Sequence, residues 1–298
     1  MAKIYLPSIK EYRDIEQIVA FGCSMTQGAE LLDSLRYPDI TNIEEFKQSF
    51  ANMVDWHVYH RAQRPIKDDM LVVEQERQLA WPGQLASLYN IPCYNYAEGG
   101  SSFEKQLIQF MDALANGKIT DKTLVVWGLT GKERGVWFQP GKFSGYMLNG
   151  AVTPEEVDEH VSNFWFKYAN SDMMLYWKYY NCLSLMFSWA NEYCNDQFLF
   201  VQAVGKDILE QDCFNKFELE YLNKNPNFFK VVTNFQNMLR PKYQKYKIFN
   251  DTRHNMFNWT EQAHWSGGSL RLAGSHPTLE AHARYARIIK EELDQYRD

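Results

Sequence analysis

Ser24 lies in the segment FGCSMTQG, which follows the short apolar run Ile18–Ala20 near the start of the chain. A serine hydroxyl becomes an effective nucleophile only when a neighbouring base takes its proton, and histidine is the side chain best matched to that task near neutral pH. His276, just before the last helical segment, is the candidate base. Acyl transfer also places negative charge on an oxygen, which fixed N–H donors stabilise. The backbone N–H groups of Ser24 and Gly100 are the candidate donors, so these residues together predict acyl-transfer chemistry.

The segments that must position these residues alternate between two hydrophobic patterns. Short apolar runs predict strands at residues 17–21, 91–97, 123–129, 197–203 and 246–249. Helical patterns occur at residues 81–90, 98–118, 164–194, 228–240 and 277–296. Strands that alternate with helices predict a parallel sheet covered on both faces. We therefore expect an α/β fold, a three-layer α/β/α sandwich with a five-stranded parallel, flavodoxin-like sheet.

Ligands in such folds bind outside the carboxyl ends of the strands. Ser24, Gly100 and Thr130 each follow one of the predicted strands, so they are expected at that edge of the sheet. We expect a single domain over residues 1–298, with an irregular insertion at about 29–80 and an expanded helical region at about 131–196. These two regions are expected to form the walls of the pocket.

The composition is that of a soluble globular protein, with 45% hydrophobic residues, 23% charged residues and a net charge of −6. This mild acidity argues against a nucleic-acid-binding or anionic-membrane-binding surface. The first residues lack the apolar core of a signal peptide, and the most apolar helical region is too short and polar to span a bilayer. We therefore expect no nucleic-acid or membrane partner, and a location in the cytoplasm or in a viral particle.

Metal chemistry is not favoured by the cysteine and histidine spacings. The five cysteines show no metal-ligand spacing and fit free thiols in a reducing compartment. Cys23 beside Ser24 is a competing nucleophile, but buried cysteines are usually inert. His57 and His60 lie three apart on a possible helix, although a solvated face is the favoured interpretation. No metal or organic cofactor is expected.

Four short blocks resemble those of the SGNH (GDSL-type) hydrolase superfamily. Its blocks Gly-Asp-Ser-x-x-x-Gly, Asn-x-Gly-x-x-Gly-x-Ser/Thr, Gly-x-Asn-Asp and Asp-x-x-His-Pro resemble, in order, residues 22–28, 95–102, 128–131 and 273–277. The blocks bracket residues 18–290, nearly the whole chain. The resemblance implies that Ser24 is the nucleophile, His276 the base and Gly100 the glycine of the oxyanion hole.

Three of the departures from the family bear on the chemistry that the resemblance implies. Cys23 replaces an aspartate that is not one of the reacting groups, and Thr130 replaces an asparagine that is normally an oxyanion donor. Removing such a donor costs about 10²–10³ in rate elsewhere. Ala273 stands where the family places the acid that orients the histidine, and losing that acid can cost about 10⁴. A backbone carbonyl could hold His276 instead, or Asp251 or Glu261 could replace the acid.

The resemblance implies an SGNH-type esterase, a serine-dependent hydrolase of carboxylic esters, including O-acetyl esters of carbohydrates. Its partner would be a small-molecule or glycan ester, and Arg134, four residues after Thr130, could bind a substrate carboxylate or phosphate. The alternative is a catalytically weak or inactive fold that acts as a binding or structural protein, for example in a virion or as a surface glycan-binding protein. Thr130 and Ala273 motivate this alternative.

Overall fold

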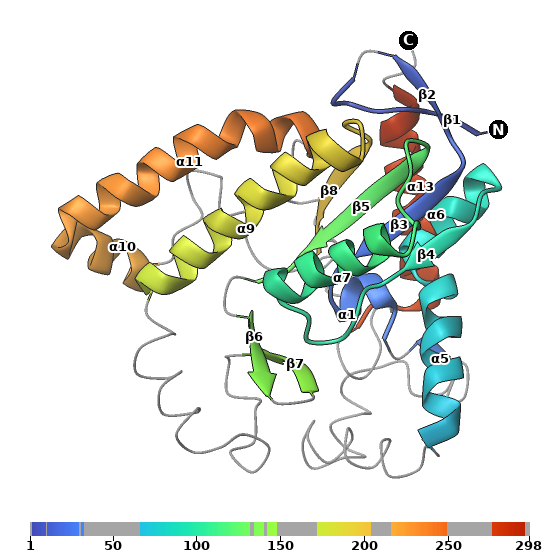
Figure 1. Ribbon diagram of the computed structural model, residues 1–298, viewed down its shortest axis with the longest axis horizontal. Helices are drawn as coiled ribbons and strands as arrows, with labels where there is room; N and C mark the ends of the chain where they lie inside the picture. Colours follow the sequence, from blue (N-terminus) through green and yellow to red (C-terminus); the bar gives the residue numbers. More distant parts are fainter. Residues whose placement is uncertain are drawn as a thin grey trace.

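The computed structural model describes residues 2–9, 11–29, 31–32, 66–131, 134–139, 142–147, 172–203, 216–248 and 276–295. Within them a four-stranded parallel sheet has helices on both faces (Figure 1). The strand order is β4-β3-β5-β8, with bounds Cys93–Asn95, Gln17–Phe21, Thr123–Leu129 and Phe198–Gln202. The predicted parallel α/β arrangement is therefore confirmed for four strands.

Alternate side chains of the strands enter two separate cores, because successive residues of a strand point to opposite faces of the sheet. In β5, Val125 and Trp127 belong to one core cluster, whereas Leu124 and Val126 belong to the other. The first cluster is closed by α7 (Phe103–Ala115), α9 (Asp172–Tyr193) and α11 (Pro226–Tyr246). The second is closed by α6 (Trp81–Tyr89) and α13 (Leu279–Gln295).

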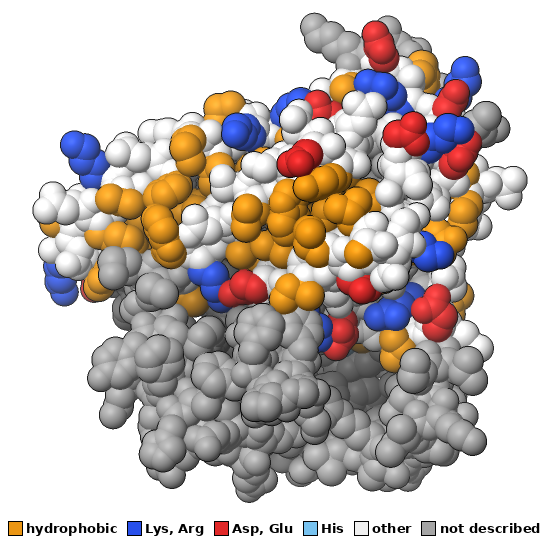
Figure 2. Space-filling view, in the orientation of Figure 1, with side chains coloured by type: hydrophobic (Ala, Val, Ile, Leu, Met, Phe, Trp, Pro, Cys, Tyr) orange, Lys and Arg blue, Asp and Glu red, His pale blue; other side chains and the backbone are white. Residues whose placement is uncertain are grey.

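The first core is rich in aromatic rings. Trp127 stacks on Phe110 with the ring centroids 5.7 Å apart, and Phe21 and Phe198 pack against the same indole. The indole Nε1–H donates to Gln106 Oε1, which satisfies its one polar group inside the core. On their outer faces, α7, α9 and α11 carry large apolar side chains that stay exposed (Figure 2); among them are Ile108, Met111, Trp177, Leu185, Val231 and Met238.

The fifth strand that we expected at 246–249 is not confirmed. Helix α11 continues through Pro241 to Tyr246, so it takes the first residue of that segment. Lys247 then forms an isolated parallel bridge with Phe200 of β8, and the Ile248 N–H donates to the Phe200 carbonyl. Residue 249 lies outside the described residues.

Several elements were not predicted from the sequence. They are the hairpin of β1 (Ala2–Tyr5) and β2 (Tyr12–Ile15), α5 (Ile66–Leu79), the hairpin of β6 (Arg134–Gln139) and β7 (Lys142–Met147), and α10 (Lys216–Lys224). Helix α5 falls in the segment that we expected to be irregular, and β6 and β7 fall in the region expected to be helical. No helix in the described ranges is long and apolar enough to cross a membrane.

Thr26, in the turn α1 (Ser24–Gln27), lies between the backbones of two strands. A β-carbon placed on Gly22, directly after β3, would lie 2.3 Å from Thr26 Oγ1, and one on Gly128 of β5 would lie 2.1 Å from it. These separations are far below van der Waals contact, so only glycine fits at either position. The turn that carries Ser24 can therefore sit tightly over the ends of β3 and β5.

We predict that Gly128→Ala destabilises the protein by about 1–3 kcal/mol, the usual cost of overpacking. A β-carbon at 128 would meet Thr26 Oγ1 at 2.1 Å but Thr26 Cβ only at 3.2 Å, whereas at Gly22 Thr26 Cβ itself is 2.5 Å away. Thr26→Ala should therefore recover most of the loss in the Gly128→Ala protein and little of it in the Gly22→Ala protein. Urea unfolding of the single and double variants measures this, and equal recovery in both backgrounds would contradict the packing described.

Candidate functional site

Ser24 begins a single helical turn directly after β3. The Cys23 carbonyl accepts the N–H groups of Thr26 and Gln27, each at 2.9 Å, and Gly28 ends the turn with φ of 81°. Met25, Thr26 and Gln27 are buried, whereas Ser24 is half-buried. No described residue accepts the Ser24 N–H, as expected at the first position of a helix. Ser24 therefore has two polar groups at the start of the turn, its hydroxyl and a backbone N–H that no described residue accepts.

Cys23 does not compete for this position in the structure. Its side chain is fully buried, in the core cluster that also contains Met25, Trp81 and Tyr285. Cys93, Cys182 and Cys194 are also buried free thiols, and burial raises the pKa of each to about 12. These three are therefore protonated and unreactive near neutral pH.

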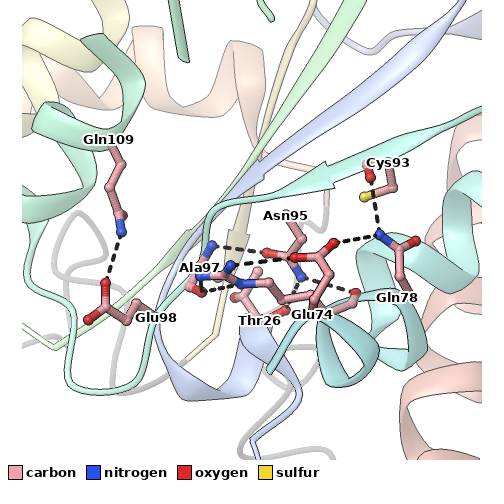
Figure 3. Close-up of polar contacts among 9 residues, drawn as sticks. Thr26, Glu74, Gln78, Cys93, Asn95, Ala97, Glu98 and Gln109 are labelled. Carbon is pink, nitrogen blue, oxygen red and sulfur yellow. Dashed lines mark hydrogen bonds and ion pairs between the residues drawn. The ribbon is translucent and has the colours of Figure 1, made fainter. Parts of the chain in front are cut away.

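Asn95, the last residue of β4, links the chain segment that follows β4 to the turn α1 (Figure 3). Its Nδ2 donates to the Thr26 carbonyl at 2.8 Å, and its Oδ1 accepts the Ala97 N–H at 3.0 Å. Arg77 of α5 adds two hydrogen bonds to the Ala97 carbonyl, at 3.1 and 3.2 Å. Asn95 is 5% exposed and these two bonds of its amide are buried, whereas those of Arg77 are partly buried; together they fix the path of the chain beside α1.

Glu98 to Ser101 form a tight turn that carries Gly100. The Ser101 N–H donates to the Glu98 carbonyl at 3.0 Å, and Gly100 has φ of 72°. A positive φ at the third residue is typical of a type II turn and requires glycine or asparagine there. On the far side of the turn, Lys105 of α7 forms an ion pair with Glu98 at 2.5 Å.

The backbone N–H groups of this segment are almost all occupied. From residue 96 to 101, five donate: Tyr96 to Ala20 O, Ala97 to Asn95 Oδ1, Glu98 to Gly22 O, Gly99 to Gln27 Oε1 and Ser101 to Glu98 O. Among the described residues, none accepts the N–H of Gly100. A β-carbon placed on Gly100 would meet nothing within 4 Å, so the surroundings of this residue are open.

The two turns meet at Gly99 and Ser24. A β-carbon placed on Gly99 would lie 3.9 Å from Ser24 Cβ and 3.5 Å from Gln27 Oε1. The structure therefore brings the first and second sequence blocks into contact, as the parallel sheet predicts. The residue with the free N–H, Gly100, is the next one along the chain from this contact.

Thr130 follows β5, as predicted, but its side chain is only 1% exposed. Its Oγ1 is buried and has no hydrogen-bond partner among the described residues. Arg134 begins β6, but its side chain lies outside what the structure describes. Asp251, Glu261 and Ala273 also fall outside the described residues, as do His57 and His60. Their roles stay predictions.

His276 is half-buried and lies three residues before α13, whose first turn is capped by the Thr278 hydroxyl. His282, one turn into that helix, is a residue that sequence reasoning did not assign to the site. It is fully buried, and its Nδ1 accepts the Trp81 N–H at 2.9 Å, where α6 begins without a capping side chain of its own. Burial, and to a smaller degree the proximity of His276, lowers the pKa of His282 to about 3.

His282 is therefore neutral near pH 7. Because Nδ1 accepts a hydrogen bond, the ring proton is on Nε2, for which no described residue is an acceptor. The helical spacing of α13 would have placed His282 on the buried face with Tyr285, Ala286 and Ile289, which is the one sequence signal that could have found it. Among the described residues, no group of three or more His, Cys, Asp and Glu side chains could hold a metal ion.

No family model and no curated protein matches this chain. Among solved structures, a member of the lipolytic protein G-D-S-L family from Veillonella parvula is similar to it, with 14% sequence identity and a TM-score of 0.40. The alignment covers 94% of this chain and 98% of the other.

The buried state of His282 predicts how stability depends on pH. The pKa is about 3 in the folded protein and has the ordinary value of 6.5 in the unfolded chain, so the unfolded chain binds an extra proton between these values. Stability should therefore fall as the pH decreases from 6.5 towards 3, by about 1.4 kcal/mol per pH unit from this residue.

His282→Gln is the matched control, because an amide oxygen can still accept the Trp81 N–H but does not titrate. Urea unfolding between pH 7 and 4 should give a shallower loss of stability for this variant than for the wild-type protein. Parallel pH profiles would show that His282 is not buried in its neutral form.

Proposed function

We propose that this protein is a serine-dependent hydrolase of carboxylic esters, with Ser24 as nucleophile and His276 as base. The observation that carries the proposal is the Gly100 N–H, which no described residue accepts, in a turn whose other N–H groups are occupied, one residue from the contact with Ser24. A free and rigidly held donor is what an oxyanion site requires, because it need not reorganise when charge develops.

In the proposed reaction, the Ser24 hydroxyl attacks the ester carbonyl while His276 takes its proton. The N–H groups of Ser24 and Gly100 donate to the oxygen that becomes negative. His276 then gives the proton to the leaving alcohol, and the acyl group stays on Ser24. Water, deprotonated by His276, attacks the acyl-enzyme and releases the acid with regeneration of the Ser24 hydroxyl.

We also propose which groups orient the His276 ring and which add a donor to the oxyanion. A backbone carbonyl, Asp251 or Glu261 would orient the imidazole in place of the acid that Ala273 replaces. Thr130, at the end of β5, would add a hydroxyl donor if a substrate reached its buried side chain. We also propose that the parallel bridge between Lys247 and Phe200 belongs to a fifth strand of the sheet. We propose carboxylic esters as the substrate class, including O-acetyl groups on carbohydrates, with Arg134 as a candidate binding residue.

A second candidate function is binding without turnover. The burial of the Thr130 hydroxyl favours it, because a side chain that is 1% exposed offers no donor to a ligand in the present conformation. The free N–H groups of Ser24 and Gly100 would then hold a carbonyl or an anionic oxygen of a glycan without a covalent step.

Reaction with a fluorophosphonate separates the two functions, since the probe reacts covalently with an activated serine. We expect stoichiometric labelling of the wild-type protein, with the modified residue identified as Ser24 by peptide mapping. Ser24→Ala should abolish labelling, and His276→Ala should slow it by about 10²–10⁴, the usual contribution of a general base.

Ser87→Ala is the matched control, because Ser87 is an exposed serine of α6 that belongs to neither turn. It should label like the wild-type protein. If the wild-type protein is not labelled by the fluorophosphonate and does not hydrolyse short p-nitrophenyl esters, the hydrolase function fails and the binding function remains. Labelling that persists in Ser24→Ala would exclude Ser24 as the nucleophile.

A further inference from the structure

We infer that Gln27 is a positioning residue of the oxyanion site, which it holds in place by fixing Gly99 against the turn of Ser24. This inference rests on the proposed function. Gln27 Oε1 accepts the Gly99 N–H at 2.6 Å, and the Gln27 side chain is buried, at 7% exposed. The bond joins two residues that are 72 positions apart in the sequence.

The position of Gln27 on α1 explains why this residue makes the bond. Residues three apart on a helix share a face, so Gln27 lies on the same side of the turn as Ser24. Thr26, by contrast, is packed between the strand ends at Gly22 and Gly128. A long amide side chain at residue 27 is therefore placed to reach the segment that passes Ser24.

The turn at Gly99 and Gly100 needs such a support. Glycine has no side chain to pack and has the largest backbone freedom of any residue, so two adjacent glycines are costly to hold in one conformation. Other contacts hold the neighbouring residues: Asn95 holds Ala97, and Lys105 holds Glu98. Among the described residues, the Gln27 amide is the one side chain that hydrogen-bonds to Gly99 or Gly100.

The hydrogen bond from Gly99 to Gln27 should affect the rate of the chemical step and not the binding of the substrate. Gln27 uses its oxygen on Gly99, so it acts on the oxyanion through the position of the next residue, Gly100. A displacement of about 1 Å in a catalytic group can cost about 10² in rate. Loss of the Gln27 bond is therefore expected to lower the rate of the chemical step while the affinity for the substrate or probe changes little.

The test compares Gln27→Met with Gln109→Met. Methionine has nearly the shape of glutamine and no hydrogen-bond acceptor of comparable strength, so it removes the bond to Gly99 with little change in packing. Gln109 also contacts this turn, through a hydrogen bond from its Nε2 to the Glu98 side chain at 3.4 Å on the protein surface (Figure 3). The same substitution at residue 109 therefore controls for a general loosening of the turn.

Fluorophosphonate labelling gives the maximal rate kinact and the apparent dissociation constant KI separately. We expect Gln27→Met to lower kinact by about 10–100-fold at nearly unchanged KI. Gln109→Met should stay within about 2-fold of the wild-type protein for both, since a surface contact of this kind contributes little. A thermal midpoint of Gln27→Met within about 5 °C of the wild-type value verifies that the variant is folded.

The outcomes separate this inference from the proposed function. If the wild-type protein is labelled at Ser24 and Gln27→Met is labelled at the same kinact, the inference is wrong and the proposed function stands. If the wild-type protein is not labelled at all, the proposed function fails, and the positioning role fails with it.

Amide hydrogen exchange on the wild-type protein tests the same bond without a variant, should Gln27→Met not fold. The Gly99 N–H should exchange more slowly than the Gly100 N–H, because it donates a partly buried hydrogen bond to Gln27 Oε1. In the fluorophosphonate adduct, Gly100 should become protected as well. Equal, rapid exchange of Gly99 and Gly100 in the free protein would overturn the inference.

Discussion

The close approach of two strand ends to the Thr26 side chain is the constraint on which the site depends. β3 and β5 lie side by side in the sheet, and the glycines at 22 and 128 leave room for Thr26 between their backbones. Any larger residue at either position would push the turn outward, and Ser24 with it. The two glycines that look like family signatures in the sequence therefore have a packing reason that is independent of catalysis.

Polar contacts from three separate parts of the chain then bring the second turn to the first. Asn95 bonds to the Thr26 carbonyl, Arg77 of α5 bonds to the Ala97 carbonyl, and Gln27 bonds to the Gly99 N–H. The Asn95 bond is buried and therefore costly to break, and the partly buried bonds of Arg77 and Gln27 add to it, so the turn is held in place although it contains two adjacent glycines. What remains free of these contacts is the Gly100 N–H, beside a half-buried serine. This combination of a fixed frame and an unused donor is the physical basis of the proposed function.

The sequence predicted those parts of the structure that depend on local patterns. β3 and β5 have apolar runs, so these strands could be placed with their boundaries, whereas α7 begins after its Ser102 cap and ends at Ala115, within the wider range 98–118 that the helical pattern predicted. Helix α5 was missed because the charged residues of its sequence leave no clear apolar face. The bond from Trp81 to His282 spans 201 positions and follows from tertiary packing, which no local pattern encodes. The roles of Asp251 and Glu261 lie outside the described residues and stay predictions.

A crystal structure of the protein after reaction with a fluorophosphonate would show whether Ser24 and Gly100 form an oxyanion site. We predict a phosphorus atom bonded to Ser24 Oγ, with one phosphoryl oxygen about 2.7–3.1 Å from the backbone nitrogens of both Ser24 and Gly100. We also predict that the Gly99 N–H keeps its bond to Gln27 Oε1. A phosphoryl oxygen that points away from Gly100, or an adduct on a residue other than Ser24, would contradict the proposed site.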